Sequence, residues 1–404
     1  MNSLFNYVKS QNVIFIYLIL LLIFLPSFEA PKNLFVILLV FTWAFVARRD
    51  NNLGGKWRVI DTIFLFWIIF DIIIGINAVV NLDLPANGSK DIIKFILVGW
   101  AVSRLSLDKK QMIFLTVTTV IFATIPLIES YYGLANNGRR VFIELNSVGH
   151  VNHTAIYLLI SYVLSSSILV LQFNKIGHTL KSTLLATTLV LAYVVVDTNS
   201  RAASGILVIF TLLLMFYAVY FYKNSKLTLA TILFVLLSVI LITNNPPPVV
   251  NKFIHGTDLV GDSPRSKIRS HVYYTYKTHP LLGVGFGNYV HFGHEEIKDA
   301  VIKDKGYYDA SQFLPSAHPH NIYYTYLVSG GMVMFSVFIW FWLHIVQIIF
   351  RVNKQSDSDY LVLSSVGVVL TILGAGWVNT TLAHENALVS MFVLGMLISK
   401  YREI

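Results

Sequence analysis

The sequence predicts an all-α polytopic integral membrane protein with about twelve transmembrane helices and one large loop that contains short helices. Only 13% of its 404 residues are charged, whereas 55% are hydrophobic. A soluble domain carries about 25% charged residues, so the composition excludes the soluble classes. Apolar runs long enough to cross a bilayer, roughly 17 to 25 residues, recur along the chain. Lys and Arg gather in alternate connections between these runs, which is the positive-inside pattern.

The apolar runs divide the chain into three parts. Residues 1–243 hold nine predicted spans, residues 244–321 the large polar loop, and residues 322–404 three further spans. The spans lie near residues 12–29, 33–47, 61–80, 91–105, 111–131, 153–172, 182–197, 204–222, 227–243, 322–350, 360–378 and 386–400. The first is expected to be a retained span, because no good small-residue cleavage site follows it. The positive-inside pattern puts both termini in the cytoplasm and the large loop on the outer face.

Composition also limits the chemistry. The chain has no cysteine, which excludes disulfides, thiolate nucleophiles and thiolate metal sites. Its net charge of +9 would suggest nucleic acid in a soluble protein, but here the location of the charges decides. The large loop lies outside and is still rich in Lys and Arg, which indicates an anionic ligand at the outer membrane surface. Short cytoplasmic loops without a P-loop argue against an ATP-driven pump.

Two stretches carry candidate phosphate-binding arginines. In DTNSRAASG, residues 197–205, Arg201 lies at an outer span boundary among small residues. It either contacts a lipid-linked phosphate or reaches ordinary headgroups as an interfacial arginine.

In residues 263–289, helical spacing puts Arg265 and Arg269 on one face, with Tyr273 near the same stripe. Arginine binds phosphate in a bidentate manner, although an amphipathic helix lying on the outer leaflet would show the same pattern. The following GVGFGN is read as a tight loop and not as a dinucleotide fingerprint, because no strand precedes it.

The stretch SAHPHNIYYTYLVSGG, residues 316–331, places His318 and His320 at the start of a long apolar helix. A His-x-His pair is compatible with a metal, but few carboxylates lie nearby. A neutral imidazole acting as a general base near neutral pH is the favoured interpretation. Asn321 is a candidate for orienting a substrate, and Gly330 with Gly331 would permit close packing behind it.

Two further outer loops are ambiguous. Residues 136–155 contain Arg139, Arg140, Asn152 and His153, which fit either a sugar or phosphate contact or an ordinary solvated loop. The last outer loop contains Asn379, His384 and Glu385, to which the same two interpretations apply.

The ordered set of motifs resembles the O-antigen ligase family. It comprises SR at an outer boundary, then R-x14-P-L-L-G-x-G-x-G-N, then P-H-N before a span with a glycine pair. The resemblance covers nearly the whole chain and implies twelve spans, cytoplasmic termini and a periplasmic loop between the ninth and tenth spans. It also implies that Arg201 and Arg265 bind phosphate and that His320 is the catalytic base. His318 is a variable neighbour, and Arg269 stands where the family often has tryptophan.

The family's chemistry predicts transfer of a glycan from undecaprenyl diphosphate to a sugar hydroxyl of lipid A–core at the periplasmic face of the inner membrane. The reaction would be inverting, with no cofactor, no metal and no nucleic acid partner. Predicted substrate-binding residues besides the catalytic His320, Arg265 and Arg201 are His318, Asn321, Arg269, Arg139, Arg140 and Tyr273. The alternatives are an O-antigen or capsule polymerase that uses the same donor and, in another class, a polysaccharide flippase. A flippase is expected to place charges mid-membrane, where Asp71 and Lys94 are the best candidates.

Overall fold

The structure is a computed structural model that describes residues 2–49, 55–86, 88–137, 143–222, 249–250, 264–355 and 359–404. Over these residues the regular structure is helical throughout, without a strand. The α-helices are α1 (Asn2–Phe24), α2 (Glu29–Arg49), α3 (Val59–Leu82), α4 (Ser89–Ser103), α5 (Lys109–Asn137), α6 (Val151–Leu171), α7 (His178–Asp197), α8 (Arg201–Tyr222), α11 (Pro264–Thr278), α12 (His294–Lys305), α13 (Ile322–Gln355), α14 (Asp359–Val369) and α15 (His384–Arg402). Short turns of other helix types include η4 (Leu370–Gly374) and η5 (Ala375–Trp377) after α14.

Within the described residues, 8 helices are long and apolar enough to cross a membrane. The chain is therefore a multi-pass membrane protein. Predicted spans 12–29, 91–105 and 386–400 also correspond to helices, namely α1, the 15-residue α4 and the 19-residue α15, which fall outside those 8. The predicted span 227–243 lies outside the described residues. The all-α polytopic class is confirmed, and the count of about twelve spans stays a prediction.

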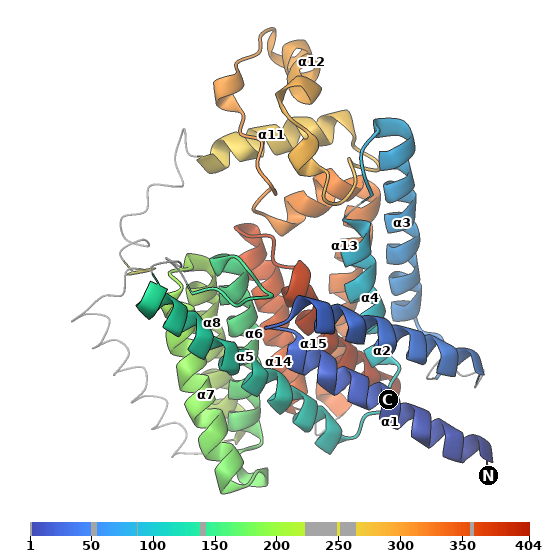
Figure 1. The fold of residues 1–404 in the computed structure, drawn as a ribbon, viewed down its shortest axis with the longest axis vertical. Coiled ribbons are helices and arrows are strands. Elements are labelled where there is room, and N and C mark those ends of the chain that lie inside the picture. Colours follow the sequence, from blue (N-terminus) through green and yellow to red (C-terminus); the bar gives the residue numbers. More distant parts are fainter. Residues whose placement is uncertain are drawn as a thin grey trace.

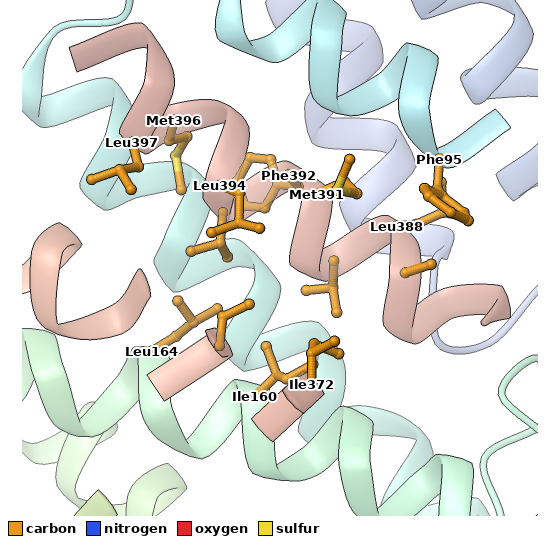
Figure 2. Close-up of a cluster of buried hydrophobic side chains, with 14 of the residues drawn as sticks. Phe95, Ile160, Leu164, Ile372, Leu388, Met391, Phe392, Leu394, Met396 and Leu397 are labelled. Atoms are coloured by element: carbon orange, nitrogen blue, oxygen red, sulfur yellow. The ribbon is translucent and has the colours of Figure 1, made fainter. Parts of the chain in front are cut away.

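Helix α15 lies at the centre of the bundle. Its residues from Glu385 to Ser399 are all buried, as expected for a helix that is covered on every face. Figure 2 shows Leu388 of this helix beside Phe95 of α4, and Ile160 of α6 beside Ile372 of η4, all within one buried cluster. Gly395 lets α4 approach closely, because an added Cβ there would lie 2.8 Å from the Cβ of Val102.

Helices α11 and α12 form a cap over one end of the bundle (Figure 1). The cap has a small core of its own, in which Tyr274 packs with Phe313 and Ile297. Its surface includes an ion pair between Lys277 and Asp304 at 2.6 Å. Residues 264–321 thus contain the short helices that the sequence predicts for the large loop, and the side of the membrane on which the cap lies stays a prediction.

A break in α13 joins the cap to the bundle. Gly331, inside α13, has φ 62° and ψ −167°, a backbone conformation that is essentially restricted to glycine. The N–H groups of Val284 and Gly285 donate to the carbonyls of Val328 and Ser329, each at 2.9 Å. Beyond the break, the N–H groups of Met332 and Val333 donate to the carbonyls of residues 280 and 281 at 2.9 and 3.2 Å. The glycine-rich loop therefore satisfies backbone groups that a break inside an apolar helix would leave without partners.

Replacing Gly331 is expected to weaken this junction. In Gly331→Ala, the added Cβ would lie 2.2 Å from the Leu281 carbonyl oxygen on a backbone that favours glycine. Gly306→Ala is the matched control, since Gly306 also has a positive φ (+78°) but nothing within 4 Å of the added carbon. We expect Gly306→Ala to lose about 1 kcal/mol from backbone strain alone and Gly331→Ala to lose clearly more. The measurement is the thermal unfolding midpoint of each purified variant in detergent; equal midpoints would contradict the role of the junction.

Candidate active site

Five histidines from three separate segments meet at the end of the bundle near the cap. The ring centroids of His318 and His320 lie 4.1 Å apart, and His318 lies 6.4 Å from His153 at the start of α6. His153 also lies 5.8 Å from His384 and 6.4 Å from His150. We call these five residues the histidine cluster. Within the part of the chain that the structure describes, no group of three or more histidines and carboxylates is arranged to hold a metal ion.

The backbone at two members of the cluster is unusual. His320 has φ 52° and His384 has φ 48°, in the left-handed region that few residues other than glycine adopt. Such strain persists where the surrounding structure holds it, and it is common at functional sites. Each residue stands at the start of a helix, His320 just before α13 and His384 at the first position of α15. The starts of these two helices therefore place both imidazoles in the histidine cluster.

Asn321 anchors the start of α13. Its side-chain oxygen accepts from the N–H of Tyr324 at 3.0 Å, and its side-chain amide donates to the carbonyl of Trp377 at 2.8 Å. The first is a helix-capping bond, and the second ties α13 to η5. Asn321 was predicted to orient a substrate, and this stays a prediction. In the structure its amide makes these two contacts, which also hold the start of α13 next to His320.

The cluster favours neutral imidazoles. Burial, together with the neighbouring His320, lowers the pKa of His318 to about 4. Burial also lowers the pKa of His320, and the positive charge of Arg265 acts in the same direction. Both effects disfavour the protonated form. At neutral pH His320 is therefore unprotonated and able to accept a proton, as a general base must be.

The predicted arginines lie around this region. Arg265, in the first turn of α11, is close enough to lower the pKa of His320 electrostatically. Arg201 is the first residue of α8 and is half-buried. Helices α6, α7 and α8 follow one another as packed neighbours joined by short turns, so the starts of α6 and α8 lie at the same end. Arg201 thus lies at the level of His153.

Two other predicted residues lie further along α11. Arg269 and Tyr273 line a hollow of about 440 Å³ together with Tyr274 and Lys305. Its lining contains none of the five histidines. Of the three residues predicted to share one face of this helix, Arg269 and Tyr273 line this hollow, whereas Arg265 does not and is near enough to affect His320 electrostatically. Arg139 and Arg140 lie outside the described residues.

The sequence analysis left His153 and His384 without a role and did not single out His150. The sequence signal for them is weak, because His150 and His153 lie in one outer loop and His384 in another, and only the fold brings these loops to His318. His153 is further held by a 3.5 Å contact between its Nδ1 and the side-chain amide of Asn386.

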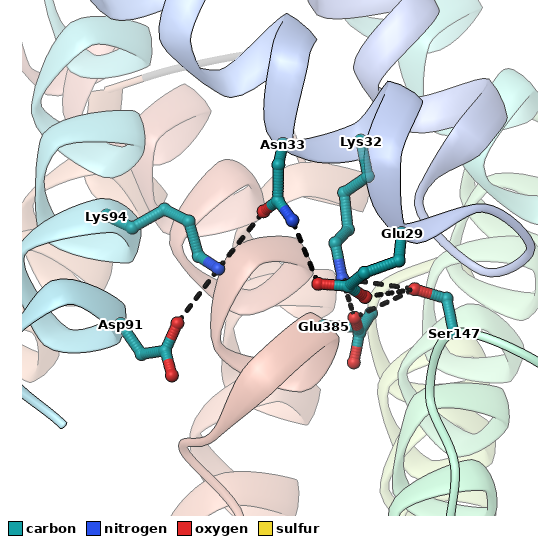
Figure 3. Close-up of polar contacts among 7 residues, drawn as sticks. All are labelled: Glu29, Lys32, Asn33, Asp91, Lys94, Ser147 and Glu385. Carbon is teal, nitrogen blue, oxygen red and sulfur yellow. Dashed lines mark hydrogen bonds and ion pairs between the residues drawn. The ribbon is translucent and has the colours of Figure 1, made fainter. Parts of the chain in front are cut away.

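A buried ionic network fixes the start of α15 (Figure 3). Lys32 of α2, which is 2% exposed, contacts the carboxylates of both Glu29 and Glu385. Ser147 completes the network, with its hydroxyl 3.0 Å from a Glu385 oxygen and 3.1 Å from a Glu29 oxygen. Glu385 directly follows His384, so this network sets where the His384 imidazole lies.

Removing Lys32 is expected to destabilise the protein strongly. In Lys32→Met, the buried Glu385 carboxylate would lose its cation, and breaking one partner of a buried pair costs about 3–5 kcal/mol. Lys298→Met is the control, because Lys298 pairs with Glu295 on the surface and exposed pairs contribute about 0–1 kcal/mol. The measurement is the thermal unfolding midpoint. A similar midpoint for both variants would show that the network does not hold the start of α15.

Comparison with known families bears on the resemblance expected from the sequence. Residues 186–339 match the family model described as O-antigen ligase. The matched stretch contains Arg201, Arg265, His318 and His320, whereas the other three members of the cluster lie outside it. No curated protein matches the chain significantly. Residues 186–339 of this multi-pass membrane protein thus match the O-antigen ligase family model, which supports the family resemblance expected from the sequence and a membrane glycosyltransferase of the ligase or polymerase type.

Proposed function

We propose that this protein transfers a glycan from undecaprenyl diphosphate to a sugar hydroxyl of lipid A–core. The reaction takes place at the periplasmic face of the bacterial inner membrane, with both termini in the cytoplasm. Membrane lipids surround the spans, and the reaction uses neither cofactor nor nucleic acid. The observation that carries the proposal is that His320, a member of the histidine cluster, lies near enough to the guanidinium of Arg265 for that charge to lower its pKa.

The chemistry is a single displacement with inversion. His320 takes the proton from the acceptor hydroxyl, and the oxygen attacks the anomeric carbon of the donor. The bond between that carbon and the diphosphate oxygen breaks, so the leaving group departs with the electron pair. Arg265 and Arg201 stabilise its negative charge, since arginine forms bidentate contacts to phosphate oxygens. The low pKa of His320 keeps it unprotonated before the reaction.

A polymerase would use the same donor and the same base, and it would differ in taking a second polyprenyl-linked glycan as acceptor. The acceptor therefore separates the two functions. In a strain that lacks its own ligase and carries a matching core and O-antigen, the wild-type protein is expected to restore the lipopolysaccharide ladder on a gel. No ladder there, followed by polymer growth in a polymerase-null strain, would favour the polymerase.

The base assignment predicts the effect of His320→Ala. Loss of a general base lowers the rate by about 10²–10⁴-fold, so the ladder is expected to disappear while the protein level is unchanged. His291→Ala is the matched control, because His291 is exposed and not a member of the cluster. A full ladder from His320→Ala would refute the proposed mechanism.

The electrostatic effect of Arg265 on His320 predicts a pH dependence. His320 is active when neutral, so transfer falls as the pH drops through its pKa, which lies below the ordinary value of 6.5. In Arg265→Gln the nearby positive charge is gone, the protonated imidazole is less disfavoured, and the pKa rises. The acid limb of kcat/KM for the acceptor should therefore move to higher pH, besides the general loss of rate. An unchanged acid limb would show that Arg265 does not act on the base.

A further inference from the structure

A cavity of about 660 Å³ opens between α2 and α4, beside the histidine cluster. The residues that line it change from polar to apolar along the helices. Near the helix starts they are polar, with Asn33, Asp91 and Lys94. Deeper in, they are apolar, with Ile37 and Val40 of α2 among the lining residues. From Asn33 to Phe41 this wall runs about 12 Å along α2, at 1.5 Å per residue. The cavity therefore suits an amphiphile with a polar head at the mouth and a hydrocarbon chain below.

The charges at the mouth favour a sugar over a diphosphate. Lys94 pairs with Asp91 at 3.0 Å and also donates to Asn33 at 3.3 Å, as Figure 3 shows. Lys32 is likewise neutralised by Glu29 and Glu385. Lys90 also lines the cavity, so its cations and carboxylates are equal in number, whereas a diphosphate is best bound where cations are in surplus. Carboxylates and amides are instead good hydrogen-bond acceptors for hydroxyl groups. The mouth thus differs in chemistry from the arginine side of the site.

The cavity leads directly to the proposed catalytic region. His384 lines it, and the His384 ring lies 5.8 Å from that of His153, a member of the histidine cluster. A hydroxyl on a head seated at the mouth would thus lie beside His384, a member of the histidine cluster to which His320 also belongs. The arginines Arg201 and Arg265 belong to α8 and α11, which do not line the cavity.

We propose that the α2–α4 cavity binds the acceptor glycolipid, with its acyl chain against Ile37 and Val40 and its sugar head against Asn33, Asp91 and Lys94. This assignment rests on the proposed function, in which the glycolipid is the acceptor. It gives the two lipid-linked substrates separate sites on opposite sides of the cluster. The acceptor class is a lipid A–core type glycolipid. The polyprenyl-linked donor binds on the arginine side.

A photocrosslink tests occupancy without relying on activity. Ile37 and Leu34 both lie on α2 and are almost equally exposed, at 52% and 51%, but only Ile37 lines the cavity. Each is replaced by p-benzoylphenylalanine in the full-length protein, which is irradiated in vesicles containing phospholipid, rough lipopolysaccharide and a polyprenyl-diphosphate glycan. Mass spectrometry is expected to find lipid A–core attached at position 37 and not at 34. Capture of phospholipid alone, equal capture at both positions, or capture of the polyprenyl lipid at position 37 would overturn the proposal.

A kinetic experiment tests the use of the cavity. Val40→Trp should fill the apolar part and raise the KM for rough lipopolysaccharide by about tenfold or more, which corresponds to about 1.4 kcal/mol or more of binding free energy. The KM for the polyprenyl-linked donor should not change, and Leu34→Trp should change neither value. Equal effects on both substrates would overturn the assignment. If the wild-type protein transfers nothing to rough lipopolysaccharide, the proposed function fails, and the crosslink alone then decides what the cavity binds.

Discussion

The arrangement of this protein depends on one break in a membrane helix. Gly331 interrupts α13, and the loop over residues 280–285 supplies the hydrogen bonds that the helix gives up on both sides of the break. The same loop continues to Phe286, whose carbonyl accepts from the N–H of Gly88 at the start of α4 at 3.1 Å. Because unpaired backbone groups are costly within a membrane, the cap, α13 and α4 are held together. The position of His320, just before α13, follows from that junction.

The histidine cluster is assembled from three segments that share no local sequence signal. Burial and neighbouring imidazoles lower the pKa of both His318 and His320, and the charge of Arg265 lowers that of His320 further. Both effects favour the neutral form of these two residues, which suits proton acceptance at neutral pH. The left-handed backbone at His320 and His384 is held by Asn321 on one side and by the Lys32 network on the other.

The charge distribution divides the site into two sides. Arg201 and Arg265 stand on α8 and α11 and present cations to a leaving diphosphate, as proposed above. On the α2–α4 side, Lys32 and Lys94 each contact a carboxylate, so the surface is nearly neutral and rich in hydrogen-bonding groups. An enzyme that joins two amphiphiles needs such a distinction, because both substrates share the membrane and differ mainly in their polar heads. Burying α15 between the two sides keeps them in fixed relation.

The sequence by itself determined the all-α membrane class, since composition and apolar run length are properties of the chain alone. It also determined the loop around Gly285 and, through family resemblance, the candidates His320 and Arg265. The span count was not resolved, because short helices such as α4 (15 residues) are covered by neighbours and do not need the full apolar length. Only the tertiary structure decided that His153 and His384 join His320, that the Asn321 amide is engaged within the protein, and that Lys32 is buried against Glu385. The reason is physical: helical periodicity and composition are local, whereas these contacts join segments up to 353 residues apart, and helix packing alone brings them together.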